Sequence, residues 1–471
     1  MTLLEDLAAL NRAQWAAFIA AVLGWTLDAF DFFLMAFMVK AIAHDFHAQI
    51  ADVFVGVAMT LMLRPFGAFF FGWLAEKYGR RPILMIDVLL FAGLELASAF
   101  APSLPVLLVL RALFGFAMGG EWGVGASLTL ESVPPKARGI ISGLLQEGYA
   151  AGYLLASLVF YFLFDRIGWR GMFMVGLVPA LLVVLLRLGV KESPVFEAGR
   201  HARPRRSLPF LTVIGVAALV VAMGPAVAGA LDKTAMLRWV YWVDAPLALC
   251  GLWVFRQHWR TALFAVALMT AFNFFSHGTQ DLYPTFLGKQ HGLDTHTVAI
   301  VAVIANVGAI AGGIGFGAAS ERLGRRWTIV IAALLSLAML PMWAFSHGVA
   351  LLAVGAFGMQ VMVQGAWGVV PAHLNELSPP DQRAAFPGYV YQLGNLLASG
   401  CVVWQSQIAE SHHGDYALAM AGVVGVVALV IAGLTLLGPE RRGADFTGQV
   451  VDAPDPLPAR WRRARLQGDR P

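Results

Sequence analysis

The chain has 471 residues, of which 59% are hydrophobic and only 13% carry a charge, and its mean hydropathy is +0.70. Soluble domains hold about 25% charged residues, so this composition excludes a chain that folds in water alone. The net charge is +4, but the basic residues lie in alternate loops and in the tail, without an aromatic-interleaved groove. We therefore expect no nucleic-acid partner.

Apolar runs of roughly 20 residues, the length that a membrane-spanning helix needs, follow one another from Gln14 to Leu437. In chain order the predicted spans are 14–38, 53–74, 83–100, 106–128, 140–164, 172–188, 208–231, 237–255, 262–287, 298–319, 328–345, 349–370, 384–408 and 416–437. They predict an all-α integral membrane protein with about 14 helices.

The distribution of basic residues predicts the orientation. Most of the 33 Lys and Arg residues share one side when the N-terminus is cytoplasmic, and cytoplasmic loops carry such an excess. We expect a multi-pass protein of the plasma or inner membrane, in contact with lipid, with both termini in the cytoplasm. Glu5 and Asp6 and the lack of a cleavage site indicate that the first apolar run is a retained helix.

A hydrophilic stretch at 191–207 divides the chain in two. We predict an N-terminal six-helix bundle over 1–190, a linker and extra transmembrane hairpin over 191–260, a C-terminal six-helix bundle over 261–438, and a basic cytoplasmic tail over 439–471. Arg238 and Asp244 in the second helix of the hairpin leave an alternative open, in which the pair 208–255 lies in the membrane interface.

One loop motif occurs in both halves. Its first copy contains Gly72, Glu76, Gly79, Arg80 and Arg81, and its second copy contains Gly317, Glu321, Gly324, Arg325 and Arg326. Each forms a tight turn whose acid can meet basic groups and a neighbouring helix end. A generic basic turn would explain one copy but hardly two at corresponding places.

The twin motif resembles the loop signature of the major facilitator superfamily, with Glu76 and Glu321 where the family has Asp. The resemblance implies two parallel repeats that rock around a central site, with these motifs as gating loops.

Ionisable residues inside spans cost about 2.5–3.5 kcal/mol on insertion scales and usually face a bundle interior. In the first four spans they are Asp28, Asp31, Arg64, Asp87, Glu95, Arg111 and Glu121. Arg offers a planar bidentate fork to a carboxylate, so Arg64 is predicted to bind the substrate, the alternative being a salt bridge between helices. Arg111 is either a coupling residue, as the family pattern implies, or a snorkelling structural arginine. For Asp87 we expect a structural role.

The span 262–287 contains Asn273, His277, Gln280 and Asp281, which fall on one face of a helix. Its sequence meets every position of the signature of the fungal lactate permeases and their bacterial relatives: Asn, two residues, Ser or Thr, His, one residue, Ser or Thr, Gln-Asp, three residues, Thr. The Asp28/Asp31 pair and the extra hairpin also resemble the related sialate permeases of the same symporter family. The alternative is a structural polar seam between helices.

Gln392 and Asn395 match a pair that the lactate branch uses for substrate recognition; interhelical hydrogen bonding is their alternative. Residue chemistry and the resemblance together predict substrate binding by Arg64, Asn273, His277, Gln280, Gln392 and Asn395, and proton coupling by Asp28, Asp31, Arg111, His277 and Asp281.

We therefore expect a secondary transporter, and not an enzyme, that carries a short monocarboxylate such as lactate or pyruvate with a proton by alternating access. Co-transport of a proton makes the translocated unit neutral. The alternative is proton symport of a larger organic acid such as sialate or an aromatic acid. No cofactor or metal is expected, and the partners are a small organic anion, a proton and lipid, with the monomer as the functional unit.

Overall fold

The computed structural model describes residues 7, 8, 10–48, 50–199 and 255–446, and every regular element within these ranges is a helix. Nine helical stretches in this part of the chain are long and apolar enough to cross a membrane. The predicted all-α membrane class is therefore confirmed. The predicted hairpin at 208–255 lies outside the described residues, apart from Phe255, so the count of 14 helices stays a prediction.

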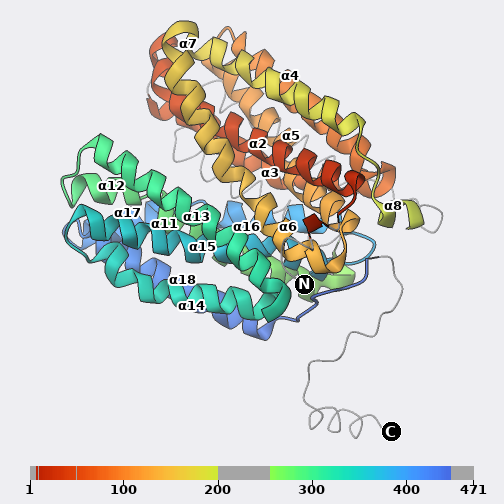
Figure 1. Cartoon of the computed structure of the whole chain (residues 1–471). Helices are drawn as coiled ribbons and strands as arrows, with labels where there is room; N and C mark the ends of the chain where they lie inside the picture. Colours follow the sequence, from red (N-terminus) through yellow and green to blue (C-terminus); the bar gives the residue numbers. More distant parts are fainter. Residues whose placement is uncertain (1–6, 9, 49, 200–254, 447–471) are drawn as a thin grey trace, which may run out of the picture.

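The first half of the chain forms one group of helices, coloured red to yellow in Figure 1. Its elements are α2 (Arg12–Asp45), α3 (Ile50–Tyr78), α4 (Arg80–Ala99), α5 (Leu104–Ser132), α6 (Arg138–Gln146), α7 (Gly148–Leu188) and α8 (Pro194–Gly199). Glycines on α5 let it approach α3 closely: a Cβ at Gly119 would lie 2.7 Å from the backbone nitrogen of Ala68.

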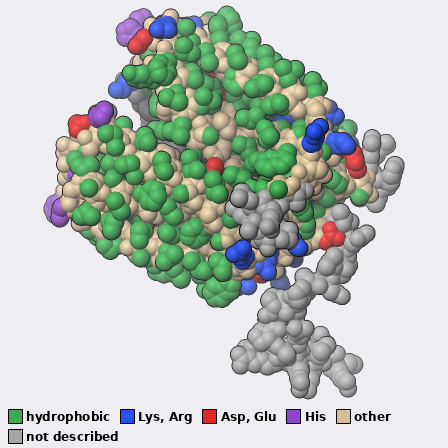
Figure 2. Space-filling model, viewed as in Figure 1, with side chains coloured by type: hydrophobic (Ala, Val, Ile, Leu, Met, Phe, Trp, Pro, Cys, Tyr) green, Lys and Arg blue, Asp and Glu red, His purple; other side chains and the backbone are tan. Residues whose placement is uncertain are grey.

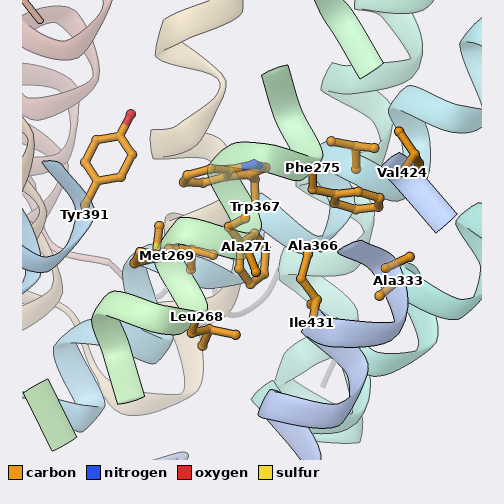
Figure 3. Packing of buried hydrophobic residues seen from close by; sticks show 14 of the residues in the cluster. Leu268, Met269, Ala271, Phe275, Ala333, Ala366, Trp367, Tyr391, Val424 and Ile431 are labelled. Carbon is orange, nitrogen blue, oxygen red and sulfur yellow. The ribbon is translucent and has the colours of Figure 1, made fainter. Parts of the chain in front are cut away.

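The second half forms a second group, green to blue in Figure 1. Its elements are α11 (Trp259–Gln280), α12 (Tyr283–Lys289), α13 (Thr295–Leu323), α14 (Arg325–Ala344), α15 (Val349–Leu377), α16 (Phe386–Ala398), α17 (Cys401–Ser411) and α18 (Tyr416–Leu437). Buried apolar side chains such as Leu268, Phe275 and Ile431 fill its interior, as Figure 3 shows.

Three predicted spans are not continuous helices. The span 140–164 is divided at Glu147, between α6 and α7. The span 262–287 breaks after Gln280 because Pro284, in the first turn of α12, has no backbone N–H to continue the ladder. The span 384–408 breaks at Ser399 and Gly400, between α16 and α17. By contrast, α7 joins the predicted spans 140–164 and 172–188 at Gly168, whose φ of 61° and ψ of −177° are not helical.

The outer surface is apolar while charged side chains lie inside. Leu185, Val307 and Val426 are more than half exposed, and Figure 2 shows hydrophobic side chains over most of the visible face. Asp28, Arg111 and other charged residues are buried. This distribution fits a protein whose outer face meets lipid.

Candidate functional site

The first copy of the loop motif forms a buried charge network at one end of the molecule. The Arg80 guanidinium lies 3.2 Å from Glu76 Oε2 and 3.1 Å from Glu131 Oε1. The Arg80 backbone N–H donates to Glu192 Oε1 over 3.0 Å. This network fixes the junction of α3, α4 and α5.

The second copy repeats this arrangement. Arg325 lies 3.0 Å from Glu321 Oε1 and 3.0 Å from Glu376 Oε2, and the Arg326 backbone N–H donates to Glu440 Oε2 over 3.0 Å. The correspondence of acid, arginine and two further acids in each half supports the internal repeat that the sequence predicts.

The acid of each motif also reaches into the other half of the molecule. The Ala384 backbone N–H, just before α16, donates to Glu76 Oε1 over 2.5 Å. The Gly139 backbone N–H, in the first turn of α6, donates to Glu321 Oε1. A carboxylate at a helix N-terminus is stabilised by the helix dipole, so both motifs hold the two halves together. We call this end, with Glu76, Arg80, Glu321 and Arg325, the basic end.

Further contacts close the basic end between the halves. Ser127 Oγ donates across the joint over 2.8–2.9 Å, to the Arg383 carbonyl or to Asn375 Oδ1, and Ser142 Oγ donates to the Gly368 carbonyl over 2.7 Å. The segment after α18, which we predicted as part of the tail, packs here as well: the Arg138 guanidinium lies 3.4 Å from the centroid of the Phe446 ring.

The opposite end is open. The side chains of His277 and Asp281 are 33% and 41% exposed, although both belong to a predicted membrane span. Figure 2 shows the surface hollowed between the two halves at the end where Figure 1 places α12 and the middle of α7. We call this the cleft end.

A hydrogen-bonded cluster at the cleft joins α11 to α16. His277 Nδ1 lies 2.9 Å from Asp281 Oδ2, and His277 Nε2 lies 3.1 Å from Asn395 Oδ1. Both neighbours are oxygen atoms, and only an imidazolium donates from both ring nitrogens. Three of the predicted site residues therefore lie together in an arrangement that fits a protonated histidine.

The other predicted residues of this half are placed differently. Gln280 Nε2 donates to Gln360 Oε1 of α15 over 2.9 Å, and Asn273 Nδ2 donates to the Met269 carbonyl of its own helix over 2.8 Å. Gln392 is buried, and its Oε1 has no hydrogen-bond donor among the described residues. Gln360 was missed because one glutamine in an apolar run gives no pattern.

Arg64 of α3 is buried in the first half, 2% exposed. Its Nη2 lies 2.7 Å from Met118 Sδ, and its guanidinium lies 5.0 Å from the centroid of the Phe32 ring. No described carboxylate lies within ion-pair distance of it. Arg64 acts electrostatically on Asp28, Tyr149 and Tyr391, so its charge is directed to the region between the halves.

Five aromatic side chains from both halves pack on one another, and we call them the aromatic layer: Trp25, Trp122, Tyr149, Trp367 and Tyr391. Two of them, Tyr149 and Tyr391, lie within electrostatic range of Arg64. Ring centroids are 4.5 Å apart for Trp122 and Tyr391, 5.4 Å for Trp25 and Tyr149, and 5.6 Å for Trp367 and Tyr391. Figure 3 shows Trp367 and Tyr391 above the apolar core of the second half. The indole N–H groups of Trp25 and Trp367 find no acceptor among the described residues. The sequence does not reveal this layer, because aromatic residues in apolar spans resemble ordinary core residues.

Away from the basic end, two fully buried ion pairs lie among the described residues of the first half. Arg111 Nη1 is 2.7 Å from Glu95 Oε2, and Arg111 Nη2 donates to Ser98 Oγ over 2.6 Å. Arg187 pairs with Glu121. Arg111 is 1% exposed, so its guanidinium does not snorkel to the surface. Arg187 was missed because it stands at the end of its span, where arginines are common.

The predicted proton-coupling acids Asp28 and Asp31 are both buried. Neither oxygen of Asp28 has a donor among the described residues. Asp31 is acted on by Arg111 and Glu95, whereas Asp28 is acted on by Arg64 and Glu121. The predicted coupling residues thus fall into two places: Asp28, Asp31 and Arg111 in the first half, and His277 with Asp281 in the second.

Comparison with known proteins identifies the family. Residues 16–213 match the family model described as Sugar (and other) transporter, and residues 263–468 match the one described as Major Facilitator Superfamily. The chain belongs to the major facilitator superfamily. It is therefore a multi-pass membrane protein of a transporter family.

The fold is similar to that of a solved member of the superfamily, the proton:xylose symporter XylE bound to 6-bromo-6-deoxy-D-glucose. The TM-score is 0.67 at 18% sequence identity, over 92% of this chain and 98% of XylE. At this identity the likeness concerns the fold alone.

Two curated relatives match along most of the chain. A carboxylic acid transporter protein homolog of Saccharomyces cerevisiae is 28% identical over 463 residues, 95% of this chain and 72% of the relative. The sialic acid transporter NanX of Escherichia coli is 25% identical over 387 residues, 82% of this chain and 84% of NanX.

Proposed function

We propose that this transporter carries a short monocarboxylate of the lactate or pyruvate type together with a proton, by alternating access. The observation that carries the proposal is a buried arginine, Arg64, that lacks a carboxylate partner in the described part of the chain and acts toward the region between the halves. Tyr149 is reached electrostatically by both Arg64 and Asp281, so a substrate beside Tyr149 would be within range of both.

Arg64 supplies the positive partner that a carboxylate needs in a site of low dielectric. A guanidinium binds a carboxylate through two parallel hydrogen bonds. Its present neighbours, a thioether and a phenyl ring, are weak ones that a carboxylate displaces at little cost. Among the described residues, the indole N–H groups of Trp25 and Trp367 without acceptors offer further donors.

Proton coupling follows from the membrane potential. Moving one negative charge against an inside-negative potential costs about 2.3 kcal/mol per 100 mV, and a proton taken up with the anion removes that cost. We propose that His277 changes its protonation state when the substrate binds. Its two oxygen neighbours favour the imidazolium, and one of them, the Asp281 carboxylate, lies beside the proton.

The observations that bear on the size of the substrate favour two different classes of acid. The signature from Asn273 to Thr285 and the relative named a carboxylic acid transporter homolog favour a short monocarboxylate. The aromatic layer, which offers ring faces to a larger or conjugated body, and the relative named a sialic acid transporter favour the second candidate, a larger organic acid.

We further propose that the basic end faces the cytoplasm and that the cleft end faces outward, with both termini in the cytoplasm and a monomer as the functional unit. The positive-inside rule supports this orientation, since the loops with Arg80, Arg81, Arg325 and Arg326 lie at the basic end.

Arg64 gives the test of the proposal. Proteoliposomes loaded with unlabelled lactate should take up labelled lactate through the unchanged protein, and unlabelled acids outside should compete in the order of their affinity. Arg64→Ala should abolish exchange. Arg64→Lys should restore it only in part, because a point charge lacks the bidentate fork.

Arg170→Ala is the matched control, since the side chain of Arg170 is partly exposed and pairs with Asp45 outside the site. Normal exchange by Arg64→Ala would remove Arg64 from the site. Competition by sialate or an aromatic acid but not by lactate or pyruvate would favour the second candidate.

A further inference from the structure

The interior of the first half contains more acids than bases. Apart from the networks of the basic end, five carboxylates and three arginines among the described residues of this half are each at most 2% exposed: Asp28, Asp31, Asp87, Glu95, Glu121, Arg64, Arg111 and Arg187. If all were ionised, two negative charges would lack a counter-charge in a water-poor interior. Such charges are so costly that carboxyl groups take up protons instead.

The ion pairs leave particular acids over. Arg111 pairs with Glu95 and Arg187 with Glu121, so Arg64 alone remains for the three aspartates. Asp31 still has Arg111 nearby and Asp28 has Arg64 nearby. In the described part of the chain the one base that acts on Asp87 is Arg187, which is already paired with Glu121.

Asp87 is 1% exposed on α4, and neither of its carboxyl oxygens has a hydrogen-bond donor among the described residues. The charged groups that act on it come from three packed helices: Glu121 on α5, Asp28 on α2 and Arg187 on α7. Two of these three are acids. An ionised Asp87 would therefore lack water and hydrogen-bond donors, and two neighbouring acids would repel its charge.

Asp87 also lies nearer the basic end than Asp28 does. It stands seven residues after Arg80, the first residue of α4, which is about 10 Å at the rise of an α-helix. Asp28 stands 16 residues after Arg12, the first residue of α2, or about 24 Å. Gly24, one turn before Asp28, packs on the pair that faces Asp87: a Cβ there would lie 2.5 Å from Arg187 Nη2 and 2.9 Å from Glu121 Cδ.

We propose that Asp87 is a second proton-binding residue, linked to the substrate site through Asp28 and placed to exchange its proton with the basic end. The cluster at His277 and Asp281 belongs to the other half, so this is a separate site. The link between Asp87 and the substrate runs through Asp28, which shares Arg64 with the substrate. This link rests on the proposed function.

The linkage follows from competition for Arg64. When a substrate carboxylate binds the guanidinium, Asp28 loses its counter-charge and takes up a proton on a carboxyl oxygen. When the substrate leaves, Asp28 is again stabilised as an anion beside Arg64 and gives up that proton. Asp87 must first release its own proton toward the basic end. The proton that Asp28 gives up can then pass to Asp87, which leaves Asp28 ionised and Asp87 neutral again, so charge is conserved.

Infrared spectroscopy of the purified full-length protein without substrate tests this site directly, because the C=O stretch of a protonated carboxyl group is separate from the bands of a carboxylate. At neutral pH the unchanged protein should show this band, and Asp87→Asn should lower it by the intensity of one carboxyl group. Asp165→Asn, which removes an exposed aspartate, should leave it unchanged. A band that Asp87→Asn does not lower overturns the proposal.

A transport measurement gives the second readout. Asp87→Asn should keep counterflow of labelled substrate but lose accumulation driven by a pH gradient by about 10-fold or more, a usual size for coupling between two sites. Asp87→Glu should restore part of the accumulation, which a purely structural role for a tightly packed aspartate would not allow.

Full accumulation by Asp87→Asn contradicts the proposal. If the unchanged protein exchanges no carboxylate at all, the proposed function fails, whereas the infrared result still decides whether Asp87 holds a proton.

Discussion

The chemistry that we propose for single residues in this chain depends on the side chains that surround them. His277 illustrates this: its ring reaches Asp281 on the same helix, four residues away, and Asn395 on α16. The four-residue spacing that the sequence displays is the spacing at which helix side chains meet. The partner on α16 depends on how α11 and α16 pack, which the sequence conveys only through the family resemblance.

At this scale we predict that Asp281→Asn separates exchange from coupling. An asparagine resembles the protonated carboxyl group in shape and charge, so substrate exchange should continue while proton-driven accumulation is lost. Counterflow and gradient-driven uptake of labelled lactate in the same proteoliposomes measure the two activities. Asp415→Asn, in an exposed loop cap, is the control. Retained accumulation by Asp281→Asn would place the proton site at Asp28, Asp31 or Asp87 instead.

Sequence patterns gave some of the site residues and could not give others. The stripe at 273–281 and the twin loop motifs stand out because their residues are polar and regularly spaced in apolar runs. Arg187, Gln360 and the aromatic layer carry no such spacing. For Asp87 the sequence indicates a structural role. Its lack of a counter-charge depends on where Arg187 and Glu121 lie, and the packing of three helices determines those positions.

At the scale of elements, the breaks in the helices position the site. α11 ends at Gln280 and α16 ends at Ala398, and both ends lie close to the cluster of His277, Asp281 and Asn395. The hydropathy pattern predicted continuous spans here because proline and glycine hardly lower the apolar average of a window. At Gly168 the difference is the opposite one: two spans that the sequence predicts as separate helices are joined in α7.

The loop motifs give a prediction for the gate. Glu76→Gln and Glu321→Gln keep an oxygen acceptor but remove the charge that meets a helix N-terminus in the other half, a contribution of about 0.3–1 kcal/mol each. Each change should therefore shift the population toward an open basic end by about 2- to 5-fold. Spin labels on cysteines introduced at the exposed positions Lys77 and Arg322 report the distance between the halves by pulsed electron paramagnetic resonance.

Substrate affinity should change little in either variant, because both glutamates lie away from the cleft. Glu410→Gln, an exposed acid on α17, should leave the distance distribution as it is. Unchanged distributions in Glu76→Gln, Glu321→Gln and the double variant would exclude these contacts from the gate.

At the scale of the whole molecule, an apolar exterior, two repeated halves and a closed basic end fit one state of the alternating-access cycle that we propose. The repeat, the all-α class and the family followed from the sequence, since hydropathy and the twin motif are properties of the chain itself. The closure of one end did not, because it depends on contacts such as Ser142 with Gly368 that join segments far apart in the chain.

The central claim, symport of a monocarboxylate with a proton, is tested most directly by following both species at once. Purified protein in proteoliposomes, suspended in weakly buffered medium without an imposed gradient, is given lactate outside. We predict that uptake of lactate makes the medium more alkaline as protons enter with it, and that Arg64→Ala removes both signals. Uptake of lactate without any change in external pH would contradict the account.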